Sequence, residues 1–137
     1  MESILNELFE EFERKEDYKV LVENLRRKRG VFKRKTTFIL KKLLEFKKEN
    51  KLSVTLAKSQ VAEVEKNGKR IEEYDLAIVN IMLKAKEVDS SYYETELDNQ
   101  ASYKLQTELD LDEFIEFCAT KESSAASQTA LLNVVSQ

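Results

Sequence analysis

The sequence predicts an all-α fold, an elongated antiparallel helical hairpin or bundle with coiled-coil-like packing. The chain has 137 residues with no proline and only two glycines, so the strongest helix breakers are nearly absent. Apolar residues recur at spacings of three, four and seven over long stretches, which is the period of one helix face. No Asn-Gly or Asp-Gly dipeptide separates two alternating apolar runs, so β-hairpins are not expected.

Two long helices are expected to form the body of this bundle. The first covers about residues 18–48 and the second about residues 54–88, with a connection at residues 49–53 and Ser53 as the helix cap. A run of about 33 residues is roughly 50 Å long and needs an equally long neighbour to cover its apolar stripe. The core residues expected to face one another are Leu25, Phe32, Ile39, Leu43 and Phe46 on the first helix and Val61, Val64, Ile71, Ile78 and Met82 on the second.

Three residues interrupt these apolar stripes. Gly30 costs roughly 1 kcal/mol relative to alanine in a helix interior. It indicates a kink, a helix start near residue 31 or the close approach of another chain, and these readings stay open. Gly68 and Asp75 replace apolar residues on the stripe of the second long helix.

Shorter helices are expected on either side of this pair. An apolar face predicts a short helix at residues 2–13, and Ser91 with Glu94 forms a capping box that starts a third main helix at about residues 91–108. Asp110 with Glu113 repeats the cap signal before a short helix at residues 110–119. Small polar residues then predict a flexible, linker-like tail at residues 120–137, so the expected domain is residues 1–119.

Charge is distributed unevenly along the chain. Residues 1–13 carry a net charge of −5, residues 14–51 one of +10 and residues 52–137 one of −8. Seven cations lie within ten residues, namely Arg26, Arg27, Lys28, Arg29, Lys33, Arg34 and Lys35. This cluster fits a solvated face paired with acids of neighbouring helices, RNA or other nucleic acid, an anionic membrane surface, or a nuclear import signal.

Few residues of the chain suit catalysis. Without histidine and with a single cysteine, no Ser-His or Cys-His pair and no zinc site is expected. The two glycines are too far apart for a phosphate loop, and the acidic residues at 110–116 lack the glycine of a calcium loop. Cys118, among Phe114, Ile115 and Phe117, is expected to be a small buried hydrophobe. We therefore expect no enzyme activity, no cofactor, no metal and no small-molecule substrate.

The segment from Leu25 to Phe38 resembles the opening of Gag-like polyproteins of Bel/Pao-type retrotransposons. The basic motif R-R-G-x-x-K-x-x-x-T of that opening is matched by Arg29-Gly30, Lys33 and Thr37. Residues 56–86 resemble the second helix of that region, and residues 88–109 resemble its acidic, tyrosine-bearing third helix. The resemblance covers roughly residues 22–110 and implies a structural region that self-associates and helps to package RNA, without catalysis.

The sequence therefore predicts a non-enzymatic assembly module that self-associates through helical packing into a homo-oligomer. An RNA-binding module using the basic segment 26–35, or a matrix-like contact with an anionic membrane, is the alternative. The single cysteine fits a reducing compartment, so the cytoplasm is expected, with the nucleus as the alternative.

Overall fold

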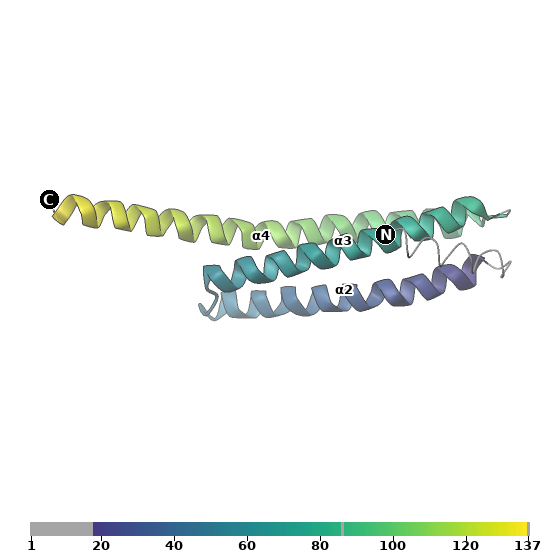
Figure 1. Cartoon of the computed structure of the whole chain (residues 1–137), viewed down its shortest axis with the longest axis horizontal. Coiled ribbons are helices and arrows are strands. Elements are labelled where there is room, and N and C mark those ends of the chain that lie inside the picture. Colours follow the sequence, from purple (N-terminus) through teal and green to yellow (C-terminus); the bar gives the residue numbers. More distant parts are fainter. Residues whose placement is uncertain (1–17, 86, 137) are drawn as a thin grey trace.

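Three long α-helices form the structure, a computed structural model that describes the backbone of residues 18–85 and 87–136 and the side chains up to residue 124. These helices are α2 (Tyr18–Lys48), α3 (Val54–Lys84) and α4 (Ser90–Ser136), and the described residues contain no strand (Figure 1). The all-α helical bundle predicted from the sequence is confirmed. The expected helix at residues 2–13 lies outside the described residues.

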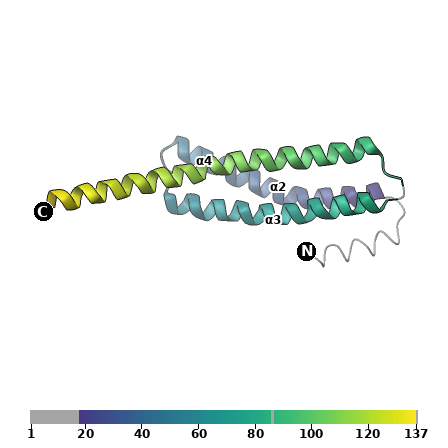
Figure 2. The same cartoon turned by 90° about the horizontal axis from the view of Figure 1, so that it is seen from above.

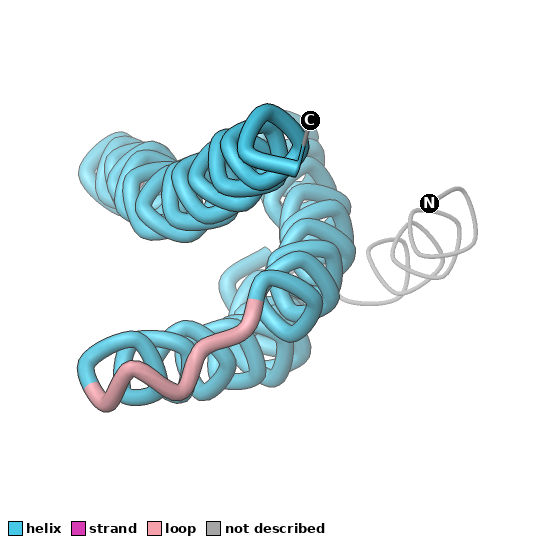
Figure 3. The backbone as a smooth tube through the Cα atoms, turned by 90° about the vertical axis from the view of Figure 1, so that its left-hand side faces the viewer, coloured by secondary structure: helices cyan, strands magenta, loops and turns pink. Residues whose placement is uncertain are grey.

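Helix α3 lies in the middle of the bundle, with α2 packed on one side and α4 on the other (Figure 1). Seen from above, α2 lies behind the other two helices (Figure 2). Short connections make α2 antiparallel to α3 and α3 antiparallel to α4, so α2 and α4 run in the same direction. Seen along the helices, the three are arranged on an arc around α3 (Figure 3). The C-terminal part of α4 extends past the turn between α2 and α3 (Figure 1).

The turn between α2 and α3 follows the sequence signals closely. Asn50 adopts a positive φ of 57°, a left-handed conformation that asparagine tolerates better than most residues. The Ser53 side chain then accepts a hydrogen bond from the backbone N–H of Leu56 at 3.1 Å, as a helix cap should. Helix α2 therefore ends at Lys48 and helix α3 begins at Val54, as predicted from the sequence.

Helix α3 ends at Lys84, earlier than the predicted residue 88. Ala85 is extended, and its N–H still bonds the carbonyl oxygens of Ile81 and Met82. The Asp89 N–H donates to the Tyr18 hydroxyl at 3.1 Å, which fixes the connection against α2. Val88 packs on the core from this connection, so a longer helix is not needed to bury it.

Helix α4 is continuous, and the predicted division into helices 91–108 and 110–119 is wrong. The Asp110 carboxylate does not cap a new helix, because it accepts a hydrogen bond from the Gln106 side chain one turn earlier. Phe114 is buried against Leu43 and Val61, and an unbroken helix places it there. At the start of α4, Asp89 rather than Ser91 is the cap, since its carboxylate accepts bonds from the N–H groups of Ser91 and Tyr92.

The predicted linker at residues 120–137 is also corrected, because α4 continues to Ser136. Small polar residues made this segment resemble a linker. It contains no glycine or proline, however, and alanine has the highest helix propensity of all residues. A helix already nucleated upstream extends through such a sequence at little cost.

Two apolar clusters form the core, one toward each end of the hairpin. The first joins the start of α2 to the end of α3 around Leu25 and Ile78, and the second joins Leu43, Val61 and Phe114. All five residues expected to face inward from α3 are buried. Of the five residues expected to face inward from α2, Leu25 and Leu43 are buried. The other three are only partly buried, namely Phe32, Ile39 and Phe46.

Candidate functional site: charged faces around a buried ion-pair network

The seven cations of the basic segment divide into two groups on α2. Arg29 is buried, and Arg26 and Lys33 are partly buried, because all three point toward α4. The Lys33 ammonium lies 4.3 Å from the centre of the Tyr103 ring. The four that remain exposed are Arg27, Lys28, Arg34 and Lys35. Only part of the predicted anion-binding cluster is therefore available to an outside partner.

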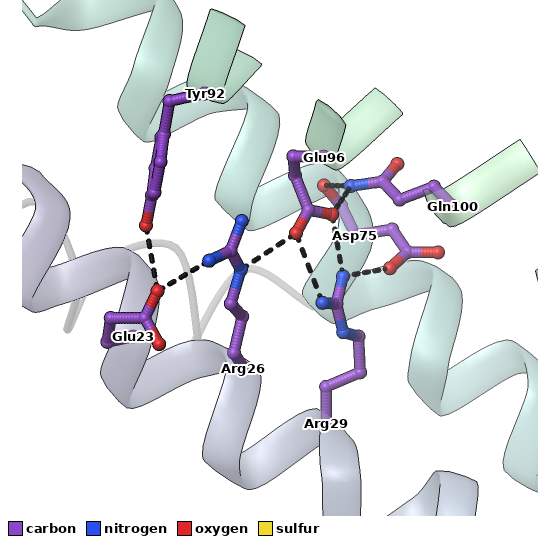
Figure 4. A network of polar contacts seen from close by, with 7 residues as sticks. All are labelled: Glu23, Arg26, Arg29, Asp75, Tyr92, Glu96 and Gln100. Carbon is purple, nitrogen blue, oxygen red and sulfur yellow. Dashed lines mark hydrogen bonds and ion pairs between the residues drawn. The ribbon is translucent and has the colours of Figure 1, made fainter. Parts of the chain in front are cut away.

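The buried arginine belongs to an ion-pair network that connects all three helices (Figure 4). Arg29 Nη1 lies 2.8 Å from Asp75 Oδ1 on α3 and 2.8 Å from Glu96 Oε2 on α4. Arg29 Nη2 donates to Glu96 Oε1 at 3.1 Å, and Arg26 Nε donates to the same oxygen at 2.9 Å. Gln100 Nε2 donates to Glu96 Oε2 at 2.7 Å. Glu96, whose side chain is only 1% exposed, is thus the shared acceptor.

Burial and hydrogen bonding act in opposite directions on these groups. Burial disfavours the charged form of Glu96, but hydrogen bonds from Arg29, Gln100 and Arg26 outweigh it and hold the pKa of this carboxyl below its ordinary value. Burial raises the pKa of Asp75, and its single bond from Arg29 does not fully offset this. Glu96 is therefore ionised at neutral pH and pairs with both guanidinium groups, while Asp75 and Glu23 supply further negative charge to Arg29 and Arg26.

A second layer of contacts continues this network to the surface. Glu23 accepts hydrogen bonds from Arg26 and from the Tyr92 hydroxyl, the latter at 2.9 Å. Burial, together with the bond to Glu23, raises the pKa of Tyr92 to about 12, so this hydroxyl stays protonated. The Arg26 guanidinium also lies 4.7 Å from the centre of the Tyr92 ring. These contacts fix Arg26 in place and withdraw it further from any external anion.

A buried ion-pair network of this kind adds little net stability, but it can favour one arrangement of the helices over others. The cost of removing the charges from water offsets most of their mutual attraction. Replacing a whole buried ion pair by apolar residues therefore often leaves the free energy of unfolding unchanged. Removing one partner leaves an unpaired buried charge and is strongly unfavourable. Because Arg29 reaches α3 and α4 at once, any shift of α4 along the hairpin would break its bonds. We infer that the network sets the register of α4.

The outward face of α2 forms a surface that we call the basic stripe. Val31 and Phe38 lie one heptad apart at its centre, and Phe38 is 63% exposed. The flanking cations, all exposed and spaced at heptad intervals in two rows, are Arg27, Lys28, Arg34, Lys35, Lys41 and Lys42. By helix geometry these residues all point away from Thr36 and Leu43, which are buried. The basic stripe is thus a polycationic surface with an exposed aromatic centre.

The outward face of α4 forms its counterpart, which we call the acidic stripe. Leu105 and Leu109 lie at its centre and are 59% and 56% exposed. Its exposed carboxylates are Glu94, Asp98, Glu108, Asp112 and Glu116. This face is opposite Glu96 and Phe114, which point into the bundle. The ion pairs among the described residues do not use any of these five carboxylates.

A groove of about 280 Å³ lies between α3 and α4 next to the network. Ile71, Tyr103 and Leu111 give it apolar walls, and Gly68 opens it, since an added Cβ there would meet no atom within 4 Å. No neighbouring helix comes so close to position 68 that only glycine would fit there. Asp75 lies at one end of the groove, where its raised pKa follows from burial.

Sequence reasoning did not anticipate Glu96 or Gln100 as functional neighbours of the basic segment. It treated Asp75 as a flaw in the apolar stripe of the second long helix, yet this residue pairs with Arg29. The charged Asp75 at a core position was the signal in the sequence that could have predicted a buried ion pair, because a buried charge requires an opposite charge across the interface. The sequence could not tell which of the many cations pairs with Asp75, since this depends on the register of the three helices.

Other kinds of site receive little support from the described residues. Across residues 18–85 and 87–136, no group of three or more histidine, cysteine or carboxylate side chains is placed to hold a metal ion. Cys118 is a buried free thiol, as the apolar neighbours in its sequence predicted. None of the described helices has an apolar stretch long enough to cross a membrane.

Comparison of the chain with protein-family models, with curated proteins and with solved structures finds no match.

Proposed function

We propose that this chain is a helical assembly module that associates with further copies of itself and performs no catalysis. The single observation that carries the proposal is the pair of exposed apolar centres, Phe38 on α2 and Leu105 with Leu109 on α4. Each is more than half exposed at the middle of a long, straight, charged helix face. Large apolar side chains in such rows are typical of surfaces that another helix covers.

The length of α4 supports the same proposal. Lys58 near the start of α3 pairs with Glu122, and α4 then continues to Ser136 beyond the turn of the hairpin (Figure 1). No other described helix lies alongside this last part. Most of the stability of a helix in a protein comes from tertiary packing, so a neighbouring chain that packs on this part would stabilise it. Self-association of this kind agrees with the resemblance to Gag-like polyprotein regions, which we carry forward as part of the proposal.

Sedimentation velocity over a wide concentration range tests the proposal. We expect the weight-average sedimentation coefficient of the whole chain to rise with protein concentration, because a small interface is weak and fills only as the concentration increases. A coefficient that stays constant at the value of one elongated monomer would exclude self-association. The same measurement at high salt shows how far charge contributes, because exposed ion pairs are screened.

Nucleic-acid binding is the second candidate, favoured by the six exposed cations of the basic stripe. Arg26 and Arg29 contribute little to it, because both are engaged by Glu96. Replacing Arg34 and Lys35 by glutamine should therefore weaken binding to labelled RNA and reduce its salt dependence. RNA affinity that is absent, or independent of salt, would exclude this candidate.

A further inference from the structure

We propose that the contact between copies joins the basic stripe of one chain to the acidic stripe of the next. This inference rests on the proposed self-association and specifies which surfaces carry it. The first argument is charge. Helix α2 carries twelve lysine and arginine residues against two acids, and α4 carries two lysines against nine acids. Two copies of the same face would repel, whereas unlike faces attract.

The shapes of the two stripes also fit. From Arg27 to Lys42 the basic stripe is about 22 Å long, and from Glu94 to Glu116 the acidic stripe is about 33 Å long, at 1.5 Å rise per residue. The acidic stripe can therefore cover the whole length of the basic one. Phe38 would lie on Leu105 and Leu109, with cations and carboxylates meeting beside them, as in the flank of a coiled coil.

Contacts within the chain leave most of the two stripes available. The ion pairs that join α2 to α4 use Arg26, Arg29 and Lys47 with Glu96 and Glu113. Those residues lie on the inward faces or at the edge between the two helices. Of the basic stripe, Lys42 pairs with Glu45 on the same helix at 3.5 Å, and both side chains stay about half exposed. The exposed carboxylates of the acidic stripe have no ion-pair partner among the described residues, so they are available to a second copy.

The arrangement predicts how association grows. A contact between two different surfaces is heterologous, so each new copy leaves one basic stripe and one acidic stripe unused. Such contacts continue into a ring or an open chain, whereas a contact between identical surfaces stops at a dimer. Because each contact is only about four helical turns long, it is weak alone, and growth depends on concentration.

Two half-blocked variants test this inference. Arg34→Glu with Phe38→Ser blocks the basic stripe, and Leu105→Ser with Asp112→Lys blocks the acidic stripe. All four positions are exposed, so folding should be unaffected, which urea denaturation verifies. The matched control is Leu83→Ser, because Leu83 is 66% exposed but lies on α3, outside both stripes.

We expect the unmodified chain and the Leu83→Ser variant to grow with concentration in sedimentation velocity. Each half-blocked variant alone should stay monomeric, with a rise in the dissociation constant of about tenfold or more, as when interface anchors are removed. An equimolar mixture of the two should form dimers that grow no further, because only one intact contact is possible between them.

Three results would overturn the inference. If the half-blocked variants associate like the unmodified chain, self-association stands but uses another surface. If the unmodified chain stays monomeric at every concentration, the proposed function fails along with the inference. If the monomeric chain instead binds RNA or phosphatidylserine vesicles and Arg34→Glu with Phe38→Ser abolishes this, the basic stripe serves phosphate groups and not a second copy.

Discussion

Replacing Glu96 by leucine is the sharpest test of the buried network. Leucine has a volume and a helix propensity close to those of glutamate, so packing and helix formation change little. The substitution removes an acceptor of four hydrogen bonds, from Arg26 Nε, both Arg29 terminal nitrogens and Gln100 Nε2. Arg29, whose side chain is 7% exposed, then keeps only Asp75 as a partner. The variant therefore isolates the cost of a buried positive charge without its main counter-ion.

The expected loss follows from the geometry of this site. Each hydrogen bond to a charged group contributes about 1.5–3 kcal/mol, but bonds sharing one carboxylate are not additive. Breaking a buried ion pair from one side typically costs about 3–5 kcal/mol. We expect a loss in that range for Glu96→Leu, a large share of a domain stability of about 5–15 kcal/mol. Arg29→Met combined with Glu96→Leu should lose less than Glu96→Leu alone, because the buried cation is gone and the Asp75 carboxylate that it leaves unpaired is 20% exposed to water.

Equilibrium urea denaturation followed by circular dichroism measures these differences. The matched control is Glu94→Gln, since Glu94 lies one half-turn earlier on the same helix and is exposed, so its loss should be within about 0.5 kcal/mol. A loss below about 1 kcal/mol for Glu96→Leu would refute the reasoning. Arg29→Met is measured alone as well, and single losses that simply add in the double variant would show that Arg29 and Glu96 are not energetically coupled.

Three further predictions concern stability. Leu43→Ala should cost about 2–5 kcal/mol in urea denaturation, because Leu43 is buried against Val61 and Phe114; a change near zero would contradict this packing. Gly68→Ala should stabilise the chain by about 0.5–1 kcal/mol, since the new methyl group meets no atom, and a loss would show that the helix needs glycine there. Because the folded pKa of Glu96 is lowered, its contribution is present above its ordinary value of 4.5 and is lost as the pH falls through the folded pKa. The stability gap between the unmodified chain and Glu96→Gln should thus shrink as the pH falls below 4.5, and a gap that stays constant throughout the acid range in which the chain is folded would contradict the assignment.

The same physical reasoning explains why some boundaries were predictable. The C-terminal end of α2 and the start of α3 follow from Asn50 and Ser53, whose local chemistry acts within a few residues. The capping signal at Asp110 failed because a cap is only a local preference. Burial of Phe114 between two other helices favours an unbroken α4 and overrides it.

The sequence by itself determined the helical class, the two long rods, their apolar stripes and the separation of positive from negative charge. These features depend on the 3.6-residue period and on composition, which need no knowledge of neighbours. The tertiary structure alone decided which cations turn inward and which stay exposed. Arg29 and Arg34 are alike in sequence context, yet only Arg29 lies opposite Asp75 and Glu96. Ion pairing between residues far apart in the chain depends on the register and rotation of three packed helices, which no local pattern encodes.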